Sequence, residues 1–167
     1  METVKSLENK YTDPKMTGNE MQIQFAAVSE NEAFARIAVA AFVTPLNPTL
    51  EEIADIKTAV SEAVTNAIIH GYEGVMEKEQ SWVYIHCLLY RDVLQVEIVD
   101  QGKGIEDVEK AMEPMYTTKP DMDRSGMGFA FMEAFMDELE VISEPGRGTT
   151  VLMSKKLGTL PFIDHEE

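Results

Sequence analysis

Residues 49–71 place the strongest constraint on the fold of this 167-residue chain. Apolar residues recur there every three or four positions, which is the period of an amphipathic α-helix. Thr49 and Glu52 form a capping-box pattern at its start, and Gly71 is a typical residue for its end. A helix with one apolar side must pack on another layer of structure. That side comprises Ile53, Ile56, Val60, Val64, Ala67 and Ile68.

Glu62 and Asn66 lie just beside this apolar side of the predicted helix. Their spacing of four residues puts their side chains about 40° apart around the helix axis, one turn above the other. A carboxylate and an amide in this arrangement suit an oxygen-liganded cation and a hydroxyl or water to be activated beside it. A solvated helix face is the ordinary interpretation of such a pair, so other motifs must decide between the two.

Three glycine motifs follow in the chain. Asp100-Gln-Gly102-Lys-Gly104 closes a strand-like run, Gly126-Met127-Gly128 opens a second helical pattern, and Gly148-Thr149 begins the last strand. Each motif alone is weak, because glycine permits positive φ in any turn. In this order after Glu62 and Asn66, they resemble the ATP-binding family shared by DNA gyrase, the Hsp90 chaperones, histidine kinases and the MutL proteins.

Longer stretches narrow the resemblance. Residues 61–73, 117–120 and 124–129 resemble the anti-sigma F factors of endospore-forming bacteria, and the likeness extends over residues 21–156. Members of that family inhibit a sporulation sigma factor and are serine kinases. The resemblance implies an ATP-dependent protein serine kinase that phosphorylates its anti-anti-sigma antagonist, and it implies a homodimer. The alternative is a nucleotide-gated binding module without catalysis.

The same resemblance implies that the cofactors are ATP or ADP with Mg²⁺, and it assigns residues to them. Asp100 would accept a hydrogen bond from the adenine amino group, and Thr149 would complete the pocket. Asn66 would ligate Mg²⁺. Gly102 and Gly104 would let the backbone approach the base. The other nucleotide contacts would be Thr117, Thr118, Lys119, Gly126, Met127 and Gly128, of which the last three offer backbone N–H groups to the phosphates.

Two residues are expected to take part in phosphoryl transfer. Glu62 would act as general base on the incoming hydroxyl. Arg124 lies in a long loop, residues 105–125, that is expected to form a lid and to carry charge to the terminal phosphate. Arg36, on the outer side of an earlier predicted helix, is the expected partner-binding residue. His70 is interpreted as a capping or packing residue rather than a phospho-acceptor.

The remaining patterns predict a single ATP-binding domain over residues 19–157, preceded by a disordered leader (1–18) and followed by a C-terminal tail (158–167). Alternating and helical periods predict an α+β fold of the Bergerat type. It would be a two-layer sandwich with helices on one face of a mixed, mostly antiparallel sheet. The predicted strands are residues 21–28, 81–90, 93–100, 139–143 and 149–155, with a tight turn at Arg91-Asp92.

The charge of the chain excludes one class of partner. Thirty acidic and fourteen basic residues give a net charge of −16. The chain therefore lacks the basic surface that nucleic-acid binding requires, whereas it would attract a basic protein partner. No apolar run is long enough to span a membrane. The single cysteine, Cys87, lies in an apolar run, which predicts a buried thiol in a cytoplasmic protein.

Overall fold

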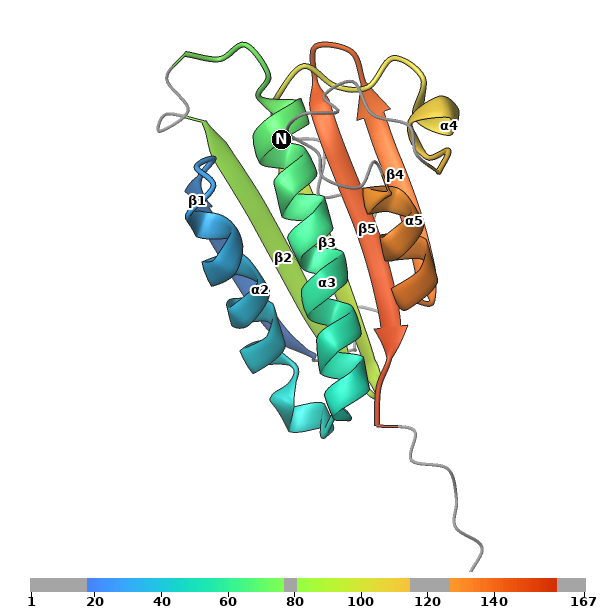
Figure 1. The fold of residues 1–167 in the computed structure, drawn as a ribbon. Coiled ribbons are helices and arrows are strands. Elements are labelled where there is room, and N and C mark those ends of the chain that lie inside the picture. Colours follow the sequence, from blue (N-terminus) through green and yellow to red (C-terminus); the bar gives the residue numbers. More distant parts are fainter. Residues whose placement is uncertain (1–17, 77–80, 115–126, 159–167) are drawn as a thin grey trace, which may run out of the picture.

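The computed structural model describes residues 18–76, 81–114 and 127–158. These residues form a 5-stranded sheet in the order β1-β2-β3-β5-β4, with the helices α2, α3 and α5 on one face (Figure 1). The predicted two-layer α+β sandwich is confirmed. The strands are β1 (Asn19–Ala26), β2 (Trp82–Tyr90), β3 (Val93–Asp100), β4 (Glu138–Glu144) and β5 (Gly148–Lys156). The helical segments are α2 (Asn31–Phe42), η1 (Thr44–Leu46), α3 (Leu50–Asn66), η2 (Ala67–Gly71), α4 (Val108–Ala111) and α5 (Gly128–Phe135).

The direction of the strands follows from the connections between them. Two helices, α2 and α3, carry the chain from β1 to β2, so the second strand runs opposite to the first. Strands β3 and β4 run in the same direction, but β5 lies between them and pairs with both. Every strand pair among the described residues is therefore antiparallel, and the parallel pairing expected in a mixed sheet is not found there.

The core lies between the sheet and its helices. Side chains of β2 alternate between buried and half-buried, because successive residues of a strand point to opposite faces. Helix α3 packs its apolar side against the buried set, as the periodicity predicts. Cys87 is fully buried, in agreement with its position in the apolar run. The most buried residues of the two elements are Val83, Ile85, Cys87, Ile56, Ala59, Val60, Ala63 and Val64.

Helix α3 begins at the predicted capping box. The Thr49 hydroxyl accepts a hydrogen bond from Glu52 N at 3.1 Å, and Thr49 N donates to Glu52 Oε2 at 2.8 Å. At its other end the helix widens into η2, a π-helical turn in which Tyr72 N donates to Ala67 O at 3.2 Å. The helical path thus runs to Gly71, as predicted, but its last turn is a wider π-helical turn that redirects the chain.

The predicted hairpin of β2 and β3 brings functional candidates to one end of the sheet. The two strands pair from Tyr90 and Val93 at the turn, where Arg91 has a φ of 52°, to Val83 and Asp100 at the far end. Asp100 is also the register partner of Thr149 on β5. The end of β3, the start of β5 and the end of α3 therefore meet at the same end of the molecule.

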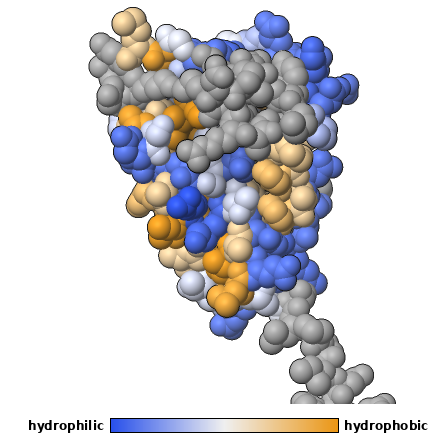
Figure 2. Space-filling view, in the orientation of Figure 1, coloured by the Kyte–Doolittle hydropathy of each residue, from blue (hydrophilic) through white to orange (hydrophobic). Residues whose placement is uncertain are grey.

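The surface of the helical layer is mixed in polarity. Hydrophobic residues are exposed over α2, over α5 and near the start of α3, with hydrophilic residues between them (Figure 2). On α2 the exposed ones are Phe34 and Ile37. Among the described residues, no helix has the length and apolar character needed to cross a membrane. Residues 1–17 of the predicted leader and 159–167 of the predicted tail lie outside the described residues.

Candidate functional site

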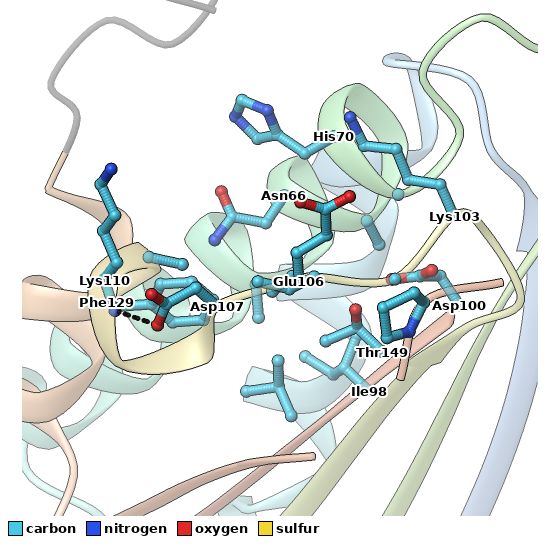
Figure 3. A pocket seen from close by; sticks show the side chains of 18 residues that line it. Asn66, His70, Ile98, Asp100, Lys103, Glu106, Asp107, Lys110, Phe129 and Thr149 are labelled. Atoms are coloured by element: carbon cyan, nitrogen blue, oxygen red, sulfur yellow. Dashed lines mark hydrogen bonds between the residues drawn. The ribbon is translucent and has the colours of Figure 1, made fainter. Parts of the chain in front are cut away.

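A cavity of about 620 Å³ lies where β3 ends and β5 begins. Its walls come from α3 and η2, from the residues that follow β3, from α4 and from the start of α5 (Figure 3). Sites for small organic ligands have volumes of this order. The sequence-predicted residues Asn66, Asp100, Gly104 and Thr149 all line this cavity.

Part of the cavity wall is apolar. Small side chains of α3 and η2 face it, and the sheet contributes two branched ones. Phe129, in the first turn of α5, adds an aromatic ring. Such a surface can cover the faces of a planar ligand without competing for its hydrogen bonds. The apolar lining residues are Ala63, Ala67, Ile98, Ile105, Ala111, Phe129, Pro145 and Val151.

Asp100 is the buried acid of the cavity. The residue is only 5% exposed, and its Oδ1 accepts a hydrogen bond from Gly102 N at 2.9 Å. Burial raises the pKa of Asp100 to about 6, although backbone hydrogen bonds from Gly102 and Thr149 oppose the shift. The carboxyl group is thus held in place while its charged form lacks full solvation. A ligand that donates a hydrogen bond to it would replace the missing solvent.

Glycines hold the surroundings of Asp100 by close packing. A Cβ at Gly71 would lie 2.7 Å from Asp100 Cγ, so only glycine lets the end of η2 pass over the carboxyl group. A Cβ at Gly102 would lie 1.8 Å from Gly71 O. Gly71 has no positive φ. Glycine is therefore required at position 71 by the close contact with the Asp100 carboxyl group, and not by a left-handed helix end. Gly102 likewise packs against protein backbone and is not among the described residues that line the cavity.

Thr149 belongs to a small hydroxyl network at the start of β5. Its Oγ1 lies 2.8 Å from Ser143 Oγ, and Ser143 also accepts a hydrogen bond from Ile105 N at 2.8 Å. Thr149 is 9% exposed. The network ties β4, β5 and the chain after β3 together on one side of the cavity. Ser143 has no motif signature, so sequence reasoning missed it.

Asn66 and Glu62 lie side by side at the start of α5. A Cβ at Gly128 would lie 3.1 Å from Glu62 Oε2 and 3.2 Å from Asn66 Nδ2, so the glycine allows α5 to approach both side chains. Asn66 lines the cavity, whereas Glu62, one turn earlier, is not among the described lining residues. The predicted stacking of the carboxylate and the amide on one side of α3 is therefore present, with the carboxylate farther from Asp100.

The donor set at this end fits a hydrated cation. The described residues contain no group of three or more His, Cys, Asp or Glu side chains that could hold a metal ion. Mg²⁺ keeps several waters and takes few protein ligands, commonly together with substrate phosphates. The Asn66 amide oxygen on the cavity wall meets this requirement, and a multi-carboxylate site does not exist among these residues.

Several polar residues on the cavity wall had no assigned function in the sequence reasoning. His70, from η2, and Lys103 both line the cavity, and Lys103 lies to the right of His70 and Asn66 in Figure 3. Lys103 also forms an ion pair with Glu73. His70, predicted as a capping or packing residue, thus also contributes to the cavity wall. His70 belongs to the 61–73 stretch, but its place on the cavity wall depends on the π-helical turn η2, which the sequence did not predict.

Arg36 lies away from this cavity, on α2. Its guanidinium forms an ion pair with Glu32 one turn earlier, at 3.3 Å, and the Glu32 carboxylate also accepts a hydrogen bond from Ser61 on α3. The Arg36 side chain remains 38% exposed.

Five of the predicted site residues lie outside the described residues: Thr117, Thr118, Lys119, Arg124 and Gly126. Residues 115–125 of the expected lid also lie outside them.

Comparisons with known proteins identify the family. A family model of the histidine kinase-like ATPase domain matches residues 25–155. The anti-sigma F factor of Oceanobacillus iheyensis is 56% identical over 139 residues, which are 83% of this chain and 93% of that protein. The anti-sigma F factor of Clostridium beijerinckii is 56% identical over 145 residues, 87% of this chain and 99% of that protein. The chain belongs to the anti-sigma F factor family.

A solved structure supports the fold of this anti-sigma F family member. The crystal structure of the RsbU and RsbW domains of a Mycobacterium tuberculosis protein matches it with a TM-score of 0.60 at 21% identity. The match covers 83% of this chain and 32% of the other chain. The family resemblance drawn from the motifs is thus confirmed, and the ATPase domain implies that the chain binds a nucleotide.

Proposed function

We propose that this protein is an anti-sigma factor and a serine kinase. It would bind and inhibit a sporulation sigma factor and transfer the γ-phosphoryl group of ATP to a serine of its anti-anti-sigma antagonist. One observation carries the proposal. A single cavity has the buried Asp100 carboxyl on one wall and the Asn66 amide on another, with Glu62 one helical turn beyond Asn66.

The Asp100 end suits the adenine base. Its carboxylate accepts a hydrogen bond from the exocyclic amino group of adenine, while guanine presents a carbonyl oxygen at that position. A buried acceptor left without a donor disfavours the wrong base, so this contact supplies specificity. The apolar side chains of α3, the sheet and Phe129 cover the faces of the ring. Thr149 and its hydroxyl network hold the neighbouring wall.

The Asn66 end suits the phosphates and their cation. Mg²⁺, held by the Asn66 amide oxygen and by phosphate oxygens, would neutralise charge on the triphosphate. Gly128 starts α5, and the backbone N–H groups of a helix start bind anions. Thr117, Thr118, Lys119, Arg124, Gly126 and Met127 complete the proposed phosphate contacts.

Glu62 is the proposed general base. As the serine hydroxyl of the antagonist attacks the γ-phosphorus, Glu62 accepts its proton and the bond from the γ-phosphorus to the bridging oxygen breaks. The products are phosphoserine and ADP. The contact of Glu62 and Asn66 with the same residue, Gly128, supports a base adjacent to the cation ligand.

Partner binding is proposed at α2. Arg36 is partly exposed and lies between the exposed apolar residues Phe34 and Ile37 in the sequence, so charge and apolar area occur together. The net charge of −16 would speed the encounter with a basic partner at low salt. A homodimer acting in the cytoplasm remains part of this proposal.

Phosphate incorporation into the antagonist tests the enzyme. The purified chain is incubated with the antagonist and Mg·ATP, and mass spectrometry counts the phosphoserine formed. Wild type and Glu51→Ala are expected to phosphorylate the antagonist, and Glu62→Ala is not. Glu51 is an exposed control in the first turn of the same helix. Equal incorporation by Glu62→Ala would remove Glu62 from the mechanism.

The absence of incorporation by wild type would favour a second function, a nucleotide-gated binding module. The position of Glu62 outside the described cavity lining is the observation that favours this alternative. In that case sigma-factor affinity would still change between ADP and ATP, which calorimetry measures directly.

A further inference from the structure

The residues that follow α3 contact the loop that follows Asp100. Helix α3 carries Asn66 and continues into the π-helical turn η2, whose wider turn sets the direction in which Gly71, Tyr72 and Glu73 leave it. Each of these three consecutive residues contacts the segment 101–103. The base end and the cation end of the cavity are therefore joined by a second connection, besides the sheet and the core.

Tyr72 makes the central contact of this clamp, which consists of residues 71–73 and 101–103. Its hydroxyl donates a hydrogen bond to Trp82 O at 2.5 Å and accepts one from Gln101 N at 2.8 Å. The side chain is 5% exposed, and burial raises the pKa of its phenol. The neutral hydroxyl thus spans from the start of β2 to the residue directly after Asp100.

The residues on either side of Tyr72 also connect the same two segments. Lys103 N donates to Gly71 O at 2.8 Å, at the place where Gly102 packs against the same carbonyl. The Lys103 ammonium forms an ion pair with the Glu73 carboxylate. This pair is partly exposed, so it contributes less than the buried hydroxyl.

We propose that Tyr72 is a positioning residue for the nucleotide, which fixes the Asp100 carboxyl relative to the Asn66 amide through the hydroxyl bridge from Trp82 O to Gln101 N. The proposal rests on the proposed binding of the adenine base at Asp100. A site that discriminates between bases requires its acceptor to be held within about 0.5 Å of the productive position. Without the bridge, the loop can shift and Asp100 can meet other donors.

The test is Tyr72→Phe, which removes one oxygen atom and keeps the ring. Tyr90→Phe is the matched control, because Tyr90 ends β2 far from the cavity and contacts Arg91. Calorimetry with Mg·ATP and Mg·GTP gives both affinities. For Tyr72→Phe the affinity for ATP is expected to fall about tenfold, as for loss of one hydrogen bond, with a smaller loss for GTP. The KM for ATP rises accordingly, and kcat at saturating ATP is unchanged.

A purely structural role would lower the melting temperature without changing the preference for ATP over GTP. Unchanged ATP affinity and unchanged preference in Tyr72→Phe would overturn the proposal. Glu73→Gln, which weakens the exposed contact of the clamp, is expected to reduce ATP affinity two- to threefold and provides a second variant. An effect equal to or larger than that of Tyr72→Phe would move the positioning role from Tyr72 to the ion pair.

Amide hydrogen exchange without nucleotide tests the clamp separately from the kinase. Faster exchange at Gln101 in Tyr72→Phe is expected, and wild-type exchange there would contradict the bridge. If wild type binds ATP but phosphorylates nothing, the kinase proposal fails while the Tyr72 effect on affinity still stands. If phosphorylation proceeds and Tyr72→Phe behaves as wild type, only the present inference fails.

Discussion

At one end of the cavity Asp100 is 5% exposed and enclosed by glycines whose neighbours leave no room for a Cβ. At the other end Asn66 and Glu62 are half-buried on the side of a regular helix, and a single glycine of α5 approaches them. The first end is built by long-range packing and the second by helical spacing. Substitutions at the Asp100 end should therefore change stability and affinity together, whereas those at the Glu62 end should change phosphoryl transfer with little change in stability.

The largest expected effect is on catalysis, at the helical end. Asn66→Ala removes the proposed cation ligand, and we expect phosphorylation of the antagonist to fall by about 10³-fold, as for loss of a key electrostatic contact. The free energy of unfolding should change by less than about 1 kcal/mol, because the side chain is half-buried. Urea denaturation and mass-spectrometric phosphate counting measure the two quantities. A large loss of unfolding free energy would show that the Asn66 end also depends on close packing, as the Asp100 end does.

Gly102→Ala should lower both the free energy of unfolding and the affinity for ATP. Its Cβ would lie 1.8 Å from Gly71 O, so the backbone must move, and such overpacking costs about 1–3 kcal/mol of unfolding free energy. ATP affinity should fall by about a hundredfold, since Asp100 moves with the loop. Gly74→Ala is the control: its φ is 78° but nothing lies within 4 Å of its Cβ, so about 1 kcal/mol of backbone strain is the whole expected effect. Similar ATP affinities for the two variants would contradict close packing as the reason for glycine at 102.

The pH dependence of Asp100 sharpens the same comparison. Its pKa is raised from 3.8 to about 6 in the folded chain. The contribution of Asp100 to the free energy of unfolding is therefore fully present below about pH 4. It is lost as the pH rises through 6, because the folded state then has to ionise a buried acid. The loss is at most about 3 kcal/mol. Asp100→Asn should abolish this decrease in unfolding free energy, measured by urea denaturation from pH 4 to 7.

Nucleotide binding should show the opposite trend. Protonation of Asp100 weakens it as an acceptor, so the affinity for ATP is expected to fall as the pH drops below about 6. The pKa of His86, on β2, is also raised, mainly by the neighbouring Glu97 carboxylate. Asp100→Asn separates the two groups, because of these two only His86 can still titrate in that variant. A pH profile of ATP affinity that persists in Asp100→Asn would assign the effect elsewhere.

The smallest expected effect is that of Ser143→Ala. Its hydroxyl connects Ile105 N with Thr149 Oγ1, on the wall next to Asp100. Loss of this group should lower the free energy of unfolding by about 1 kcal/mol and ATP affinity by a few-fold. Calorimetry and thermal denaturation measure both. A change in kcat without a change in affinity would show that this network serves the phosphate end instead.

Local patterns were predicted well from the sequence. The capping box of Thr49 and Glu52, the hairpin turn at Arg91 and the apolar side of α3 all occur where the periodicity indicates. Each depends on residues only a few positions apart, and their geometry follows from backbone dihedrals and hydrogen bonds within one element. The motif order carried the family resemblance, which the comparisons confirm.

By itself, then, the sequence determined the helix with its Glu62 and Asn66 pair, the strands and the family. Only the tertiary structure decided why residue 71 is glycine, that His70 lines the cavity, and that the Tyr72 hydroxyl reaches Gln101, 29 residues away. It also decided that β5 separates β3 from β4. The physical reason is that these features depend on contacts between distant segments, which have no periodic signature and exist only once the core has brought the segments together.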